Sequence, residues 1–383
     1  MNNTIFSILF FSVALVFSAR YEASFTLPKL VYLYSCTLAL AASWLYAYRK
    51  GHVHPIPSPV LYFALAFALW LLLSTTFAIH VPTAVFGVYG RWQGLLTHLA
   101  YVGLSLMAAT LPLDRHKTLK AFVLAMLCVA VVAITQRLNF VNSPILGGRS
   151  FSTIGNAIPM AACLALAIPF ALYFAVRGKW RTLWVLIALI LLAGIIVSES
   201  RGPELGLLVA LSIMLAGALK RKNTAIIGIA IIIGALLFVN PRNNISNITK
   251  DTGFTYRIMY SKAALGMIKD YPIFGVGLEN YRIAYPKYRT AESRQIEPQV
   301  IPTKAHNGYL QYAATTGILG LIYYLILVGA CLRSVQTEDR LLRIALVAAI
   351  AGYLVQDMTG WEDVSLTSFF YITLGIGINK GTH

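Results

Sequence analysis

The chain has 383 residues, of which 58% are hydrophobic and only 12% are charged, and its mean hydropathy is +0.70. Soluble domains carry roughly 25% charged and 45–50% apolar residues, so this composition excludes a disordered chain, a collagen-like chain and an ordinary soluble enzyme. Lys and Arg outnumber Asp and Glu by 31 to 14. Because the basic residues lie in short loops between apolar runs, the excess indicates orientation in a membrane and contact with its lipids, and no nucleic-acid partner is expected.

Apolar runs predict the membrane spans. About 20 apolar residues cross a bilayer core, and by this measure the chain has about twelve spans. They lie near residues 3–19, 30–48, 60–79, 95–112, 119–136, 157–176, 183–199, 203–219, 224–240, 308–332, 341–358 and 365–379. We therefore expect an all-α polytopic membrane protein, with helices 1–9 in residues 1–240, one large outer loop in 241–307 and helices 10–12 in 308–383.

The distribution of Lys and Arg predicts the orientation. With the N-terminus placed inside, the short inner loops hold 15 of these residues, the short outer loops hold six, and the remaining ten lie in 241–307. Positively charged short loops stay in the cytoplasm, whereas long loops are exempt from this rule. Both termini are therefore predicted to be cytoplasmic, and the large loop is predicted to face outward. The first run has no positive residue before it, which favours a retained span over a signal peptide.

Arg201 stands at the outer start of a predicted span, in the run Ser198-Glu199-Ser200-Arg201-Gly202-Pro203-Glu204-Leu205. Pro203 suits the first turn of a helix. A helix N-terminus with a guanidinium beside it is a suitable anion site. The alternative is a structural arginine that pairs with Glu199 or Glu204.

The outer loop contains one amphipathic helical pattern, from about Tyr256 to Lys269. At 100° per residue, Arg257 lies on the side of Ser261 and Ala264, whereas Lys262 and Lys269 lie on the opposite side. An arginine on the packed face requires an anion, which can be a protein carboxylate, a lipid headgroup or a substrate phosphate.

His306 precedes the span that begins near residue 308. Gly317 follows eleven residues later and is predicted on the same helix face, with Gly320 one turn deeper. Small residues on one face allow two membrane helices to approach closely. A histidine held there is either structural or a base, because its ordinary pKa of about 6.5 suits proton transfer near neutrality.

Other features are weaker. Arg91, in Gly90-Arg91-Trp92-Gln93-Gly94, offers an anion contact or simple interfacial anchoring, and Asp357 could pair with any of these arginines. The sequence contains no phosphate-loop, HExxH or GxSxG motif and no acidic cluster with metal-site spacing. Neither a cofactor nor a metal is therefore expected.

Two motifs resemble those of the bacterial O-antigen ligase family. His306-Asn307, nine residues, Gly317, two residues and Gly320 match its H-[NSQ]-x9-G-x-x-[GTY] pattern, and Arg201 with Leu205 matches its R-x3-L pattern. The segment from Arg257 to Gly277 and the segment Tyr89–Leu95 are also similar to family segments. The resemblance covers most of the chain and is sharpest over 199–320.

The resemblance implies a GT-C-type membrane glycosyltransferase of the bacterial inner membrane, with its active site on the periplasmic face. Such enzymes move a glycan from undecaprenyl diphosphate to a lipid acceptor, usually lipid A–core, without a nucleotide sugar or a metal. It implies catalytic roles for His306, Arg201 and Arg257, and substrate contacts by Arg91, Asn307 and Tyr309. An O-antigen polymerase that uses the same donor remains an alternative, as does protein glycosylation. A transporter is disfavoured because the charges gather at the outer surface and not at the midplane.

Overall fold

The computed structural model describes residues 6–9, 12–18, 25–140, 149–219 and 252–381. All regular secondary structure in these ranges is helical, which confirms the predicted all-α class. In the described part of the chain, seven helices are long and apolar enough to cross a membrane. They are α2 (Thr26–Arg49), α3 (Ser58–Thr76), α6 (Arg115–Arg137), α7 (Ala157–Arg177), α8 (Arg181–Ser198), α9 (Arg201–Leu219) and α15 (Gly308–Arg333).

Three further helices coincide with predicted spans: α5 (Leu95–Thr110), α16 (Arg340–Gln356) and α17 (Val364–Ile378). The predicted span 224–240 lies outside the described residues, and the span 3–19 lies partly outside them. The number of twelve spans therefore stays a prediction.

Polar residues fix where many helices begin. Each accepts a hydrogen bond from a backbone N–H of the first turn, which otherwise has no partner within the helix. These caps are Asp114 on α6, Asn156 on α7, Asn307 on α15, Asp339 on α16 and Asp363 on α17.

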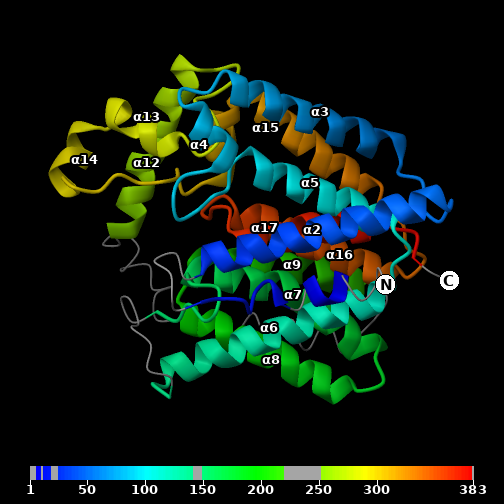
Figure 1. The fold of residues 1–383 in the computed structure, drawn as a ribbon. Coiled ribbons are helices and arrows are strands. Elements are labelled where there is room, and N and C mark those ends of the chain that lie inside the picture. Colours follow the sequence, from blue (N-terminus) through cyan, green and yellow to red (C-terminus); the bar gives the residue numbers. More distant parts are fainter. Residues whose placement is uncertain (1–5, 10–11, 19–24, 141–148, 220–251, 382–383) are drawn as a thin grey trace.

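The core of the bundle consists of helices that are apolar on every side. All residues of α17 are buried, as are those of α7 from Ala157 to Ala175. In Figure 1, α7, α9, α16 and α17 lie between α6 and α8 on one side and α3, α5 and α15 on the other. The exposed apolar side chains of the outer helices, such as Leu38 on α2 and Tyr62 on α3, suit contact with lipid.

The connecting segments gather at two opposite ends. Residues from 113–116, 335–343 and 380–381 line one cavity of about 560 Å³, and all three segments were predicted to face inward. At the other end, α12 (Thr252–Asp270), α13 (Tyr281–Tyr288) and α14 (Ala291–Ile296) project from the bundle beside α4 (Val81–Phe86) (Figure 1). The predicted amphipathic helix is therefore present as α12, and two short helices follow it that the sequence pattern did not predict.

Helix α15 is broken at Gly317, which has φ 76° and ψ 170°. The prediction that His306 and Gly317 share one face of a continuous helix is therefore wrong. The turn at 271–277 packs into the break, and a Cβ on Gly317 would collide with the carbonyl of Ile273. The freed carbonyls of Ala314 and Thr315 accept N–H bonds from Val276 and Gly277, both at 2.9 Å. Such pairing allows a broken helix at membrane depth.

Candidate functional site

His306 lies in the loop immediately before α15, and Asn307 caps the helix. The backbone of His306 has φ 55°, in the left-handed region that costs a non-glycine residue about 1 kcal/mol or more. The imidazole packs between two aromatic rings: the Tyr260 ring centroid is 5.5 Å away and that of Trp361 is 4.6 Å away. The sequence placed His306 at the entry of a span, but it gave no sign of these two neighbours.

The surroundings of His306 favour the neutral imidazole. Burial lowers its pKa, and the positive charges of Arg257, Arg91 and Lys304 lower it further, to about 4. The expectation of an ordinary value near 6.5 is therefore corrected. At neutral pH the ring is uncharged and able to accept a proton.

Arg201 and Arg257 line one small cavity of about 90 Å³, together with Arg149 and Thr359. We call it the arginine cavity. Arg201 is the first residue of α9, after Glu199 in the left-handed region at φ 51°. The cavity thus combines a helix N-terminus with three guanidinium groups and one carboxylate, that of Glu199, and this excess of positive charge favours an anion. Sequence analysis singled out Arg201 and Arg257 but did not predict that Arg149 joins them.

Other contacts of this segment involve different arginines. The carboxylate of Glu199 lies 3.1 Å from Nη2 of Arg137. Arg149 donates from Nε to the Ser198 carbonyl at 2.9 Å and from Nη2 to Ser200 Oγ at 2.6 Å. These bonds anchor the Arg149 side chain against the turn that leads into α9.

The orientation of α12 agrees with the helical wheel. Ala264 is fully buried, whereas Lys262 and Lys269 are exposed. Lys262 lies 3.9 Å from Glu292 of α14. Arg257 is partly buried and lines the cavity described above.

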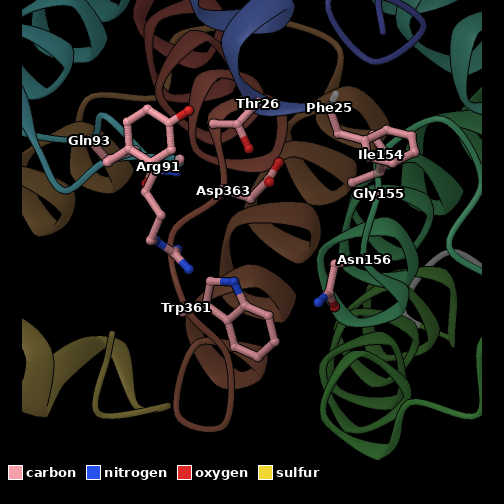
Figure 2. A pocket seen from close by; sticks show the side chains of 11 residues that line it. Phe25, Thr26, Arg91, Gln93, Ile154, Gly155, Asn156, Trp361 and Asp363 are labelled. Atoms are coloured by element: carbon pink, nitrogen blue, oxygen red, sulfur yellow. The ribbon is translucent and has the colours of Figure 1, made fainter. Parts of the chain in front are cut away.

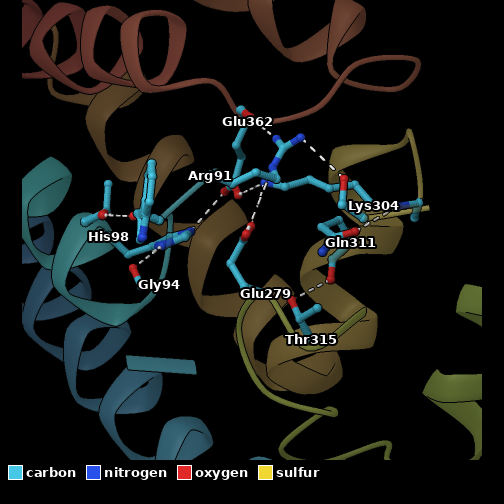
Figure 3. A network of polar contacts seen from close by, with 12 residues as sticks. Arg91, Gly94, His98, Glu279, Lys304, Gln311, Thr315 and Glu362 are labelled. Carbon is cyan, nitrogen blue, oxygen red and sulfur yellow. Dashed lines mark hydrogen bonds and ion pairs between the residues drawn. The ribbon is translucent and has the colours of Figure 1, made fainter. Parts of the chain in front are cut away.

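A buried ionic network adjoins the loop that carries His306 (Figure 3). Nζ of Lys304 is 3.1 Å from both Glu362 Oε2 and Glu279 Oε1, and no side chain of these three is more than 7% exposed. His98 Nε2 is 3.1 Å from Glu362 Oε1. Arg91 donates to the Glu362 carbonyl at 3.0 Å. The network therefore joins α5 to four separate loops.

Electrostatics favour the ionised form of Glu362. Burial alone would raise the pKa of Glu362, but His98 and Lys304 hold that pKa well below its usual range. Sequence analysis did not single out Lys304, Glu279 or Glu362. Buried charges in a membrane protein require such partners.

Arg91 also lines a second cavity, of about 410 Å³, with Trp361 and Asp363 (Figure 2). Asn307 and Tyr309 have structural contacts. Asn307 accepts the Leu310 N–H at 3.0 Å, and the Tyr309 hydroxyl donates to the Leu354 carbonyl at 2.7 Å. Their predicted contact with substrate stays a prediction.

The loop 357–363, between α16 and α17, links these features. It supplies Thr359 to the arginine cavity, Trp361 to His306 and Glu362 to the ionic network. Of its residues, sequence analysis considered only Asp357, which is buried and accepts the Gly308 N–H through its own carbonyl at 2.8 Å. The run Trp361-Glu362-Asp363 between two apolar spans is the signal that could have drawn attention to it.

A family model described as O-antigen ligase matches residues 186–325. Over these residues the chain is similar to the O-antigen ligase family. The matched segment includes Arg201, Arg257 and His306, so the resemblance of the motifs is confirmed. No curated protein matches the chain.

The match, together with the apolar helices, supports a multi-pass membrane protein and an enzyme of the glycosyltransferase-like kind. Ligases and polymerases of this kind use lipid-linked glycans and lipid acceptors, and the match disfavours a transporter. Arg91, Arg149 and the loop 357–363 lie outside the matched segment and still contribute to the site. Among the described residues, no group of three or more His, Cys, Asp or Glu side chains is placed to hold a metal ion.

Proposed function

We propose that this chain is an O-antigen ligase-type glycosyltransferase of GT-C architecture. It transfers a glycan from undecaprenyl diphosphate to lipid A–core on the periplasmic face of the bacterial inner membrane. The observation that carries the proposal is the position of Arg257, which lines the arginine cavity and whose charge also acts on His306. An anion-binding group and a neutral base therefore lie together at one end of the bundle.

The arginine cavity holds the diphosphate of the donor. Arg201 and Arg257 present forked donors that match phosphate oxygens, with Arg149 beside them. Each charge-assisted bond contributes about 1.5–3 kcal/mol. These bonds strengthen as negative charge develops on the leaving diphosphate, which lowers the barrier.

His306 acts as the general base. Its neutral imidazole accepts the proton of an acceptor hydroxyl as that oxygen bonds to the anomeric carbon. The bond from that carbon to the diphosphate breaks in the same step, and undecaprenyl diphosphate departs with the electron pair. The single displacement inverts the anomeric carbon, and the imidazolium then releases its proton to water. The arginines neutralise the leaving group, so activity is expected to persist in a chelator.

Glycan analysis of a deletion strain tests the proposal. We expect loss of polymer on lipid A–core, while polymer linked to undecaprenyl diphosphate accumulates. Purified protein supplied with the carrier-linked glycan should then transfer it to lipid A–core. A strain that instead carries single repeat units on lipid A–core would identify the polymerase activity and contradict the ligase assignment.

A further inference from the structure

The cavity of about 410 Å³ beside Trp361, here called the Trp361 cavity, has no role in the chemistry proposed above. Its volume falls within the roughly 300–1,000 Å³ of small-molecule sites. Segments far apart in the sequence form it: the start of α2, the loop after α4, the turn before α7 and the loop 357–363. Figure 2 shows Arg91, Asp363 and Trp361 around the same space.

The lining of the Trp361 cavity combines aromatic rings with hydrogen-bonding groups of both kinds. Trp361 and Tyr89 supply rings, Asp363 supplies acceptors, and Arg91 and Gln93 supply donors. A sugar ring has an apolar face of C–H groups and a rim of hydroxyls that both donate and accept. Aromatic surface with a few placed polar groups therefore suits a saccharide better than a purely apolar or a purely anionic ligand.

The position of the Trp361 cavity relative to His306 distinguishes donor from acceptor. Trp361 lines the cavity and lies 4.6 Å from the His306 ring, centroid to centroid. Arg257 lines the other cavity, with Arg149 and Arg201, and its charge acts on the same imidazole. A base that removes a proton from the acceptor must contact the acceptor, so the cavity without the arginine cluster is the one that suits it.

We propose that the Trp361 cavity is the acceptor subsite, which binds a terminal sugar of the acceptor glycan and directs one hydroxyl toward His306. This inference rests on the proposed function. Trp361 provides the surface on which the sugar stacks, and Asp363 accepts hydrogen bonds from its hydroxyls. Tyr89, which is 71% exposed, lines the cavity and offers a second ring to the sugar.

Two variants test the subsite in the full-length purified protein. Asp363→Asn removes the charge but retains an oxygen that can cap α17, where Asp363 accepts the Ser365 N–H at 2.9 Å. Tyr89→Ala removes an exposed ring. The control is Tyr62→Ala, an equally exposed tyrosine on α3, away from the cavity.

The assay uses glycan on undecaprenyl diphosphate as donor and lipid A–core as acceptor. We expect both variants to raise KM for the acceptor by about tenfold, the effect of losing one good contact. Their KM for the donor should stay unchanged, and the control variant should keep both KM values of the wild-type protein. Unchanged acceptor KM in both variants would overturn the assignment. A rise confined to donor KM would also overturn it, because the cavity would then hold the donor sugar.

A binding measurement separates failure of this inference from failure of the proposed function. Water-soluble core oligosaccharide, freed of lipid A, is titrated into the protein and followed by saturation-transfer NMR. Binding that both variants weaken supports a saccharide subsite even if no transfer is detected, in which case only the proposed function fails. The subsite is contradicted if the oligosaccharide does not bind the wild-type protein, or if it binds both variants as tightly as the wild-type protein.

Discussion

The imidazole of His306 lies edge-on to the indole of Trp361, with ring centroids 4.6 Å apart and ring planes at 71°. His306 precedes α15 and Trp361 follows α16, so the contact joins the start of α15 to the end of α16. The position of His306 thus depends on a loop beyond the segment that matches the family. Residues of that loop also reach the arginine cavity and the ionic network.

His306→Ala should reduce glycan transfer by about 10²–10⁴-fold, the usual contribution of a positioned acid or base. Membrane levels and donor binding should stay near wild type, because the ring is in a loop and not in the packed middle of a helix. The measurement is transfer from carrier-linked glycan to lipid A–core by purified protein. Near-normal turnover would leave His306 a structural role.

The pH dependence of transfer should reflect the lowered pKa of His306. Only the neutral ring accepts a proton, so kcat/KM should be constant near neutrality and fall as pH drops through about 4. A bound diphosphate offsets the charge of Arg257, one of the groups that lower this pKa, so the acid limb of kcat should lie at higher pH than that of kcat/KM. His116→Gln, at the opposite end of the bundle, is the control. If the acid limbs of kcat and kcat/KM instead coincide near pH 6.5, the pKa of His306 is not lowered by burial and by the neighbouring positive charges.

Arg201→Lys and Arg257→Lys should each strongly reduce transfer, because lysine keeps the charge but lacks the planar fork that matches phosphate oxygens. Arg343→Lys, at the opposite end, should have no effect. Transfer rates are compared at equal amounts of membrane-inserted protein. Full activity in both site variants would refute diphosphate binding by these arginines.

Lys304→Met should destabilise the protein by roughly 3–5 kcal/mol, because it leaves two buried carboxylates without their shared partner. Lys117→Met removes an exposed pair with Asp114 and should cost less than about 1 kcal/mol. Thermal unfolding of the purified proteins measures the difference. In the double variant Lys304→Met with Glu362→Gln, the loss in free energy of unfolding should be smaller than the sum of the losses in the two single variants. Additive losses would mean that the two side chains are not coupled.

Single cysteines should establish the orientation in the membrane. In a variant that lacks the four native cysteines, cysteine at 262 should react with a membrane-impermeant thiol reagent in intact spheroplasts, because Lys262 is exposed on α12. Cysteine at 264 should react slowly, since Ala264 is buried. Cysteine at 343 should react only after the membrane is opened. The reverse order for 262 and 343 would invert the predicted topology.

Composition and local pattern alone determined the class of this protein and the location of most of its helices. Long apolar runs can be stable only as lipid-exposed or buried helices, because a bilayer leaves backbone groups no other partner. The wheel of 256–269 also gave the correct buried face, since the 3.6-residue period is a local property. The motifs around Arg201 and His306 were sufficient to identify the family.

The tertiary structure decided how the site is assembled. Arg149, Trp361 and Glu362 come from segments with no periodic relation to His306, so no spacing rule could place them in the same region of the structure. The break at Gly317 was hidden because its cause is the turn at 271–277, which packs against α15 from elsewhere in the chain. The pKa of His306 likewise depends on burial and on charges brought in by α12 and by two loops. Such long-range contacts arise only when the helices pack, and they place an uncharged histidine close to a cluster of arginines.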